Sequence, residues 1–372
     1  MKLIELRHKI DEIDLQMKEL FLKRMGIAEA VAETKLQTGD KILKPEREAE
    51  IIQTLTSDVP GDLQASYGIF LSKLMEVSRT RQYRKLLKLG AAFEMNFIEK
   101  AIPIAEAVYQ GLPCSYSETA VNHLFPDANI SAVSTFEDVF LAINSGAVQT
   151  GVVPLENTTA GGVYEVYDLL LKHDLYINAC EIIRVNHCLA ALPGAVLSDI
   201  KTVYSHPQAI AQSAEFLKAR GIASRESSNT AVAAKEIADG NDKSCGAVCS
   251  VNAAERYGLS VLAEGINHNK ENATKFVAVS KQLIIEGHHD RIAVVFACPH
   301  RSGSLAGVLG IFGDYGVNLT EIHSRPDGKS PWEYLFYVDF TGNLKDEHIR
   351  ALMFQLTEEL PFVKIIGSYK SK

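Results

Sequence analysis

Apolar residues recur at helical spacing from the N-terminus to about residue 88. They fall every three or four positions, which is the pattern of one face of a helix. Pro45 suits the first turn of a second helix, and a third helix runs over about 63–88. The pattern predicts an all-α three-helix unit over residues 1–88, followed by a connector over 89–104.

The pattern changes at about residue 105. From there to residue 283, short apolar runs such as TGVVPLEN and KFVAVSK alternate with helix-like segments, which is typical of an α/β domain. From residue 287 the order is strand, helix, two strands, helix and strand, as in a ferredoxin-like layer. We therefore expect a multidomain chain, with an α/β domain over 105–283 and an α+β ferredoxin-like domain over 287–372.

Composition places the chain among soluble globular proteins. It has 372 residues, 47% of them hydrophobic and 23% charged, enough for two or three domains. The formal net charge of −8 disfavours nucleic acid as a global partner. No apolar run reaches membrane-spanning length, and the charged N-terminal helix is unlike a signal peptide. We expect no membrane partner and a cytoplasmic location.

Cysteine usage argues against a metal site. The six cysteines are scattered, and CGAVC at 245–249 lacks the CxxC spacing of structural zinc sites. Buried free thiols in a reducing compartment are the default. We expect neither a bound metal nor a cofactor.

Three cations lie on the first predicted helix. Arg24 and Lys35 are eleven residues apart, which is about three turns, so they share a face. Arg7 lies about 25 Å from Arg24 along the axis, too far for both to hold one small molecule. Either the cations form a solvated face, or Arg7 reaches an anion site in a second subunit of a helical dimer.

The next two helices carry further polar side chains. Arg47 and Glu48 fall in the first turn of the second helix, and Ser78 and Gln82 share one face of the third. Cations, a carboxylate, a hydroxyl and an amide could then converge within the three-helix unit.

These residues resemble the all-helical chorismate mutase family over about residues 1–88. The matching features are LR–KID, the spacing of Arg24 and Lys35, PEREAEI, and Ser78 with Gln82. The resemblance implies an interlocked dimer that converts chorismate to prephenate. Such a rearrangement needs a compact substrate and stabilised charge on the ether oxygen, without a nucleophile or metal.

The same resemblance implies a role for each residue. Two arginines clamp the substrate carboxylates, a lysine and a glutamine act catalytically at the ether oxygen, and a glutamate takes the ring hydroxyl. Arg24 and the partner subunit's Arg7 match the two arginines. Lys35 and Gln82 match the lysine and the glutamine, and Glu48 matches the glutamate. Arg47 and Ser78 complete the pocket. The family usually has Asp where this chain has Lys44, which implies a weaker contact to the substrate hydroxyl.

The middle domain has polar residues where its predicted strands begin or end. They occur in GVVPLENTTAGGV, VYSHPQA and NATKF, and the candidates are Asn157, Thr158, Ser205, Gln208, Thr274 and Lys275. Polar groups at strand ends suit anion recognition, although each segment alone could be an ordinary capped turn. His206 could be a general base or a structural residue in its turn.

Together these segments resemble prephenate dehydratases over about residues 106–282. The resemblance implies two α/β lobes with the site between them, and a reaction that removes water and carbon dioxide from prephenate to give phenylpyruvate. It implies that Thr274 is catalytic and helps the ring hydroxyl to leave, and that the other five candidates bind substrate. The family commonly has Gly at Cys114 and Arg at Lys275, which implies altered substrate affinity.

The C-terminal unit resembles ACT regulatory domains that sense phenylalanine, through RSGSLAGVLGIFGDYGVNLTEIHSRP and PWEYLFYVDF. The resemblance implies that phenylalanine binds between two such domains and inhibits the enzyme. The residues implied are Gly303, Ser304, Leu305, Asn318, Leu319, Ser324 and Arg325. His323 replaces a glutamate of the family motif, which leaves the strength of inhibition open, and the unit could also serve only dimerisation.

The sequence therefore favours a bifunctional enzyme, a chorismate mutase and prephenate dehydratase with a phenylalanine-responsive tail, as a homodimer or a higher oligomer. A ligand sensor without catalysis is a rival, but it would not need Thr274 together with the cationic helix. A second rival keeps the dehydratase and reduces the helical unit to a dimerisation arm; Lys44 is the residue that favours it.

Overall fold

The structure, a computed structural model, describes residues 2–326 and 334–372. It divides into two compact units. The first contains the chain up to Met95 and Ile292–Ile365, and the second contains Asn96–Arg291 and Ile366–Lys372. Residues 331–333 of the predicted PWEYLFYVDF motif lie outside the described residues, and the exact domain boundaries stay predictions.

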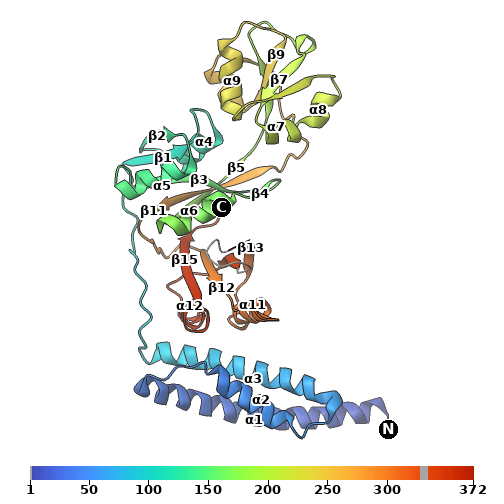
Figure 1. Ribbon diagram of the computed structural model, residues 1–372, viewed down its shortest axis with the longest axis vertical. Helices are drawn as coiled ribbons and strands as arrows, with labels where there is room; N and C mark the ends of the chain where they lie inside the picture. The colour runs from blue at the N-terminus through green and yellow to red at the C-terminus, as the bar shows by residue number, and fades with distance from the viewer. Residues whose placement is uncertain (1, 327–333) are drawn as a thin grey trace. The chain divides into compact units, whose positions relative to one another are not determined.

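Three helices form the N-terminal part of the first unit (Figure 1). They are α1 (Leu3–Thr38), α2 (Pro45–Thr56) and α3 (Gly61–Lys88). Gly39 ends α1 with a φ of 72°, a left-handed conformation that glycine adopts without strain. Burial on α1 is confined to Met25, Ala28 and Ala32, so α1 packs only through its C-terminal half.

The N-terminal half of α1 leaves its apolar stripe uncovered in the single chain. Its exposed apolar residues are Leu3, Ile4, Leu6, Ile10, Ile13, Leu15, Met17, Leu20, Phe21 and Leu22. A contiguous apolar face of this kind marks an interaction surface.

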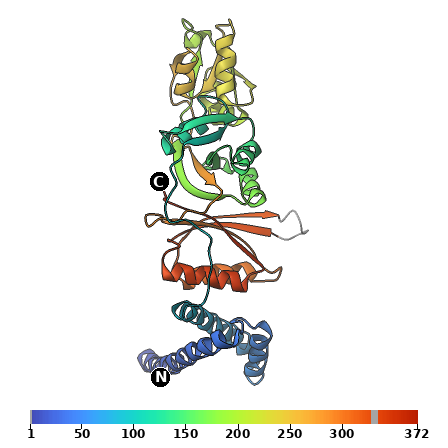
Figure 2. The ribbon, with the colours of Figure 1, turned by 90° about the vertical axis from the view of Figure 1, so that its left-hand side faces the viewer.

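The rest of the first unit has the predicted order strand, helix, two strands, helix, strand. The elements are β12 (Arg291–Ala297), α11 (Ser304–Asp314), β13 (Leu319–Pro326), β14 (Tyr334–Thr341), α12 (Glu347–Glu359) and β15 (Phe362–Tyr369). The strands lie in the order β13-β14-β12-β15, with α12 on one face (Figure 2). α12 also packs on α3, where the rings of Tyr83 and Phe354 meet edge to face at 5.4 Å.

The second unit contains two α/β lobes (Figure 1). The first has the strand order β5-β11-β3-β1-β2, with β4 beside β3, and the second has β10-β6-β9-β7-β8. The first lobe is built from β1 (Glu106–Gln110), α4 (Tyr116–Leu124), β2 (Asn129–Val133), α5 (Phe136–Ser145), β3 (Thr150–Asn157), β4 (Gly161–Gly162), α6 (Tyr164–His173), β5 (Tyr176–Arg184) and β11 (Ala273–Ser280).

The second lobe is inserted between β5 and β11. Its elements are β6 (Cys188–Ala191), a 3₁₀ turn (Leu197–Asp199), β7 (Thr202–Ser205), α7 (Pro207–Gln212), α8 (Ala214–Lys218), β8 (Ala223–Glu226), α9 (Thr230–Asp239), β9 (Cys245–Cys249), α10 (Val251–Arg256) and β10 (Ser260–Ala263). The chain thus crosses between the lobes twice, so residues far apart in sequence can face one cleft. Across the described residues, no helix has the length and apolar character needed to span a bilayer.

Candidate active sites

The helical region brings two of its predicted cations together. Lys35 donates from Nζ to the carbonyls of Lys41 and Ile42, at 2.9 Å each, and Arg24 donates from Nη1 to the carbonyl of Leu74 at 3.3 Å. Partial burial lowers the pKa of both groups, and the negative charge of Glu48 acts in the opposite direction on each. Because Glu48 acts on both cations, the three charges belong to one neighbourhood.

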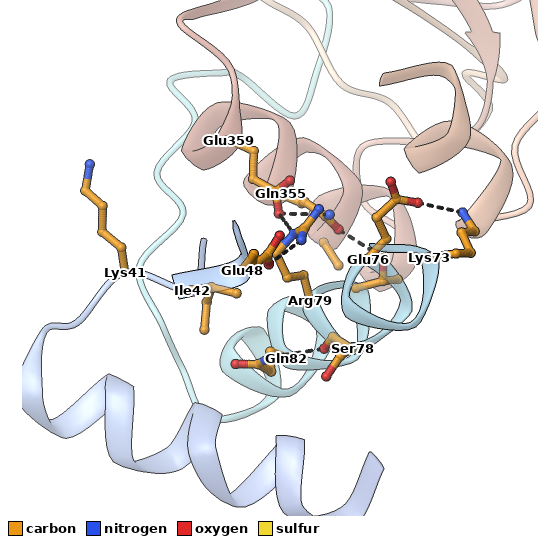
Figure 3. A network of polar contacts seen from close by, with 12 residues as sticks. Lys41, Ile42, Glu48, Lys73, Glu76, Ser78, Arg79, Gln82, Gln355 and Glu359 are labelled. Carbon is orange, nitrogen blue, oxygen red and sulfur yellow. Dashed lines mark hydrogen bonds and ion pairs between the residues drawn. The ribbon is translucent and has the colours of Figure 1, made fainter. Parts of the chain in front are cut away.

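The third helix contributes an amide and a hydroxyl to this region (Figure 3). Ser78 and Gln82 are both buried, and Gln82 donates from Nε2 to the carbonyl of Ser78 at 3.3 Å. The buried Oε1 of Gln82 has no hydrogen-bond partner. A buried polar atom without a partner is costly, and a ligand could relieve that cost.

Two predicted cations do not join this group in one chain. Arg7 is exposed on α1, and Arg47 pairs with Glu50 at 2.6 Å on the exposed side of α2. Lys44 pairs with Asp40 at 2.9 Å, and its positive charge contributes to the lowered pKa of Lys35. A single chain therefore provides one carboxylate clamp, Arg24, and leaves a second clamp to come from elsewhere.

In the second unit, a cavity of about 480 Å³ is lined by residues of both lobes. Asn157, Gln208 and Thr274, all predicted from the sequence, lie in its wall together with His206. Thr274 is placed by the sheet, because it pairs with Asn157 of β3 on one side and Ile183 of β5 on the other.

Asn157 is the centre of the polar network in this cavity. Its Nδ2 donates to Thr274 Oγ1 and to Asn272 Oδ1, at 2.9 Å each. Its Oδ1 accepts from the amides of Thr159 and Ala160 at 3.0 Å and from Gln208 Nε2 at 3.4 Å. Since Thr274 Oγ1 accepts from Asn157, its own proton can point at a ligand.

The structure places three other predicted residues away from the cavity lining. Ser205 is fully buried and donates to the carbonyl of Val248 at 2.5 Å. Thr158 Oγ1 accepts from the amide of Ala273 at 3.0 Å, holding the start of β11. Lys275 follows Thr274 on a strand, so it points to the opposite face, and its Nζ lies 5.2 Å from the centroid of the Tyr369 ring.

Among the lining residues that were not predicted from the sequence, His187, Gln212 and Asn272 are joined by hydrogen bonds. His187 contacts Gln212 through Nε2 at 3.1 Å, and Gln212 Oε1 also accepts from Asn272 Nδ2 at 2.9 Å. Burial lowers the pKa of His187 to about 4, so it is neutral at pH 7 and donates from Nε2. Spacing could have revealed two of them: Asn272 lies just before β11, two residues from Thr274, and Gln212 is four from Gln208 on α7.

Part of the lining comes from segments at or just before the starts of helices. These are 115–117 at α4, 161–163 before α6, 206–209 at α7 and 228–230 at α9. Backbone N–H groups at helix starts favour anions. None of the described lining residues is Lys, Arg, Asp or Glu.

Cys114, next to this cavity, has a φ of 68°. This left-handed conformation is strained for a residue with a Cβ. It gives a physical reason for the glycine that the sequence resemblance places at this position.

The predicted regulatory residues do not lie together in one chain. Gly303, with a φ of 81°, precedes Ser304 at the start of α11, whereas Asn318 follows the end of that helix. Eleven helical residues span about 16 Å, so one small ligand cannot touch both groups within one chain. Ser324 and Arg325 lie at the far end of β13, paired with Phe336 and Leu335.

Comparison with known families identifies the parts. The chorismate mutase type II family matches residues 6–83, the prephenate dehydratase family residues 107–283, and the ACT domain family residues 292–358. The chain is 30% identical to the bifunctional chorismate mutase/prephenate dehydratase of Aquifex aeolicus (strain VF5) over 372 residues, which cover 99% of this chain and 98% of that protein.

Two further proteins are similar over the C-terminal two thirds. Arogenate dehydratase/prephenate dehydratase 1, chloroplastic, of Arabidopsis thaliana is 35% identical over 278 residues, 70% of this chain and 71% of that protein. The prephenate dehydratase of Arthrobacter aurescens, solved with L-Phe, has a TM-score of 0.67 at 28% identity and covers 72% of this chain and 90% of its own. These matches confirm the predicted fold class and enzyme class: the chain belongs to the bifunctional chorismate mutase/prephenate dehydratase family and ends in an ACT domain.

Proposed function

We propose that the chain catalyses two successive steps of phenylalanine biosynthesis. The helical region converts chorismate to prephenate, and the cavity of the second unit converts prephenate to phenylpyruvate. The observation that carries the proposal is the Asn157–Thr274 pair, which aims a hydroxyl into a cavity ringed by helix N-termini. A cytoplasmic location stays a prediction from the sequence.

The test is a coupled assay of the purified full chain. Chorismate should disappear, prephenate should appear transiently, and phenylpyruvate should accumulate. Prephenate added directly should give phenylpyruvate without a lag. Failure to consume chorismate would overturn the first assignment, and prephenate that remains unchanged would overturn the second.

The mutase site is proposed to be shared between two chains. Arg24, Lys35, Glu48, Ser78 and Gln82 lie in one region, but Arg7 is remote on the same helix and exposed. The uncovered apolar face of the N-terminal half of α1 surrounds Arg7. A second copy packed on this face would bury apolar area and bring its own Arg7 toward the Arg24 of the first copy, while Arg47 would line the outer wall.

In the dehydratase, Thr274 is proposed to assist departure of the ring hydroxyl. Its hydroxyl donates a hydrogen bond to the leaving oxygen, which takes up a proton from solvent and leaves as water. The ring carboxylate leaves as carbon dioxide, and the electron pair of that C–C bond completes the aromatic ring. Asn157 and Gln208 orient the group, and the helix N-termini hold the substrate carboxylates.

The cavity favours prephenate over arogenate as substrate. Arogenate has an ammonium group where prephenate has a keto group. The described lining contains no Asp or Glu to pair with an ammonium, and an unpaired charge is costly to bury. The chain should therefore have the higher kcat/KM with prephenate; a preference for arogenate in parallel assays would contradict this assignment.

Phenylalanine is proposed to inhibit the dehydratase by binding between two ACT domains. Because Gly303 and Asn318 lie at opposite ends of α11, two chains would each contribute one group, so the ligand would also link the chains. Ser304 and Leu305 extend the first group, Leu319 the second, and Ser324 and Arg325 the edge near β13. Inhibition requires tighter binding to the less active state.

Gly303 offers a direct test of this regulatory site. Gly303→Val should weaken inhibition about tenfold or more, because a branched side chain would block the approach of the ligand to the backbone. Gly303→Asn is the matched control for backbone strain, since Asn tolerates a positive φ. Calorimetry with phenylalanine on the intact protein reports binding directly; no heat at millimolar ligand would remove the proposed sensor.

A further inference from the structure

Arg79 on α3 lies between two carboxylates from different parts of the first unit (Figure 3). Its Nη1 donates to Glu48 Oε1 of α2 at 2.5 Å, and its Nε donates to Glu359 Oε1 of α12 at 3.0 Å. Glu48 belongs to the proposed mutase site, and Glu359 belongs to the ACT domain. One guanidinium therefore connects the two.

This contact is buried enough to fix geometry. The side chains are 11% exposed for Arg79, 5% for Glu359 and 25% for Glu48. Burial alone would lower the pKa of Arg79, but the charges of Glu359 and Glu48 together raise it. Burial raises the pKa of Glu359 despite the guanidinium, and the negative charge of Glu48 adds a smaller contribution in the same direction.

Glu359 is itself held by neighbouring groups. Its Oε1 accepts from Gln355 Nε2 at 3.1 Å. Gln355 is fully buried, and its Oε1 accepts from Thr80 of α3 at 3.3 Å and from Tyr315 at 3.1 Å. The acceptor for Arg79 on α12 is thus fixed by a network that leads back to α3.

The use of Lys44 in this chain makes the position of Glu48 more important. The acidic residue that the mutase family usually has there is replaced by a lysine that pairs with Asp40. Glu48 is then the acidic residue left, among the predicted mutase positions, to accept the substrate hydroxyl. Arg79 engages Oε1 of Glu48, so Oε2 is available for that hydroxyl.

We propose that Arg79 is a positioning residue of the mutase: it fixes the Glu48 carboxylate, and Glu359 of the ACT domain fixes Arg79. This inference rests on the proposed role of Glu48 in binding chorismate. An arginine suits the task because Nε and Nη1 can donate to separate acceptors in a fixed fork, which the single ammonium of lysine cannot do. Mutase activity in this chain would then depend on a residue of its C-terminal domain.

The first experiment replaces Arg79 in the full chain. Arg79→Gln should lower kcat/KM for chorismate by about tenfold, the value of one charge-assisted hydrogen bond. The dehydratase activity of the same chain should stay within about twofold, since that site lies in the second unit. It is therefore an internal control for folding. Arg79→Lys should restore part of the activity.

Double variants show whether Arg79 acts through Glu48. In a Glu48→Gln background, Arg79→Gln should have little further effect, because the carboxylate it positions is gone. Glu359→Gln keeps a hydrogen-bond acceptor but removes the charge. As a single substitution it should lower kcat/KM for chorismate by about threefold. In an Arg79→Gln background it should cause no further decrease.

Lys73 provides a matched control for docking of the C-terminal domain. It is also on α3, and it pairs with Asp314 of α11 at 2.9 Å, without contact to Glu48. Lys73→Gln should leave the mutase within about twofold. A loss as large as that of Arg79→Gln would mean that docking, not positioning, matters, and would overturn the proposal.

Other outcomes separate the two levels of inference. Three outcomes would each overturn the positioning role alone. The first is an unchanged mutase in Arg79→Gln, and the second is an equal loss of both reactions in Arg79→Lys and in Glu359→Gln. The third is that the effects of Arg79→Gln and Glu48→Gln add. A Glu48→Gln variant with normal mutase kinetics would also overturn the proposed contact of Glu48 with chorismate.

Discussion

In our proposal, the two sites bind similar ligands by different means. Chorismate and prephenate are both dicarboxylates with a ring hydroxyl. The helical site offers cationic side chains, Arg24 and Lys35, on one long helix, and needs a second chain to complete it in our proposal. The dehydratase cavity has no Lys, Arg, Asp or Glu in its described lining and offers backbone and neutral polar groups near helix starts instead.

The difference follows from the folds. Long parallel helices have their ends far apart, about 50 Å for 36 residues, so backbone N–H groups cannot converge and side chains must carry the charge. Each lobe of an α/β domain turns from strand to helix at one edge, so several helix starts meet there. Fold class thus decides whether side chains or backbone recognise the same carboxylates.

The largest expected effect breaks the helical site. Arg24→Ala should lower kcat/KM for chorismate by about 10³-fold, because a bidentate carboxylate clamp is lost in a partly buried site. Prephenate turnover in the same chain should persist. Equal loss of both activities would indicate a folding defect and would leave Arg24 without a special role.

Hybrid dimers sharpen this result. Arg7→Ala and Arg24→Ala chains should each be inactive as mutases, but mixed dimers should recover activity in one of their two sites. That site would draw intact Arg24 from one chain and intact Arg7 from the other. Absence of recovery in dimers shown to be mixed would argue against a shared site.

The next largest effect is expected at the dehydratase cavity. Thr274→Val keeps the shape of the side chain but removes the hydroxyl, so kcat for prephenate should fall by about 10²-fold with a smaller change in KM. Thr158→Val is a matched control, because Thr158 lies outside the cavity lining and supports β11. Near-normal turnover in Thr274→Val would move attention to His206 and His187.

Acid should destabilise the second unit through its buried histidine. The pKa of His187 is about 4 in the folded chain and about 6.5 when unfolded. Its contribution to stability is therefore present above pH 6.5 and is lost as the pH falls toward 4. Between pH 7 and pH 5 the free energy of unfolding should drop by about 2 kcal/mol.

The control is His187→Asn, which should be less stable at pH 7 but should show a flatter decline toward pH 5. Urea unfolding of the full chain at pH 7 and at pH 5, followed by circular dichroism, gives the measurement. An unchanged pH dependence in the variant would show that other groups carry the acid sensitivity.

Sequence reasoning found the broad arrangement because it depends on local signals. Helical spacing revealed α1 and α3, and the order of elements in the ACT domain followed from alternating runs. Strand periodicity argues against one of the predicted substrate-binding residues. Thr274 and Lys275 are adjacent on β11, so they point to opposite faces and cannot both line one cavity.

Other features could not be predicted from local patterns. His187 reaches the cavity because the chain crosses between two lobes, and Ser205 is directed into the core by its bond to Val248. Arg79 looks like a surface cation in the sequence, and only the packing of α12 on α3 shows that Glu359 meets it. Contacts between distant segments depend on tertiary packing, which spacing does not encode.

The smallest expected effect concerns the backbone beside the neutral cavity. Cys114 has a φ of 68°, and its side chain also packs against the core of the second lobe, so Cys114→Gly alone would mix two contributions. Comparing Cys114→Gly with Cys114→Ala separates them, because both lose the sulfur but only Gly relieves the strain. Gly should be more stable by about 1 kcal/mol in urea unfolding, the reverse of the usual order. Asp174→Gly against Asp174→Ala is the parallel pair at the other described non-glycine residue with positive φ. If Cys114→Ala is as stable as Cys114→Gly or more stable, then the backbone at residue 114 does not impose left-handed strain.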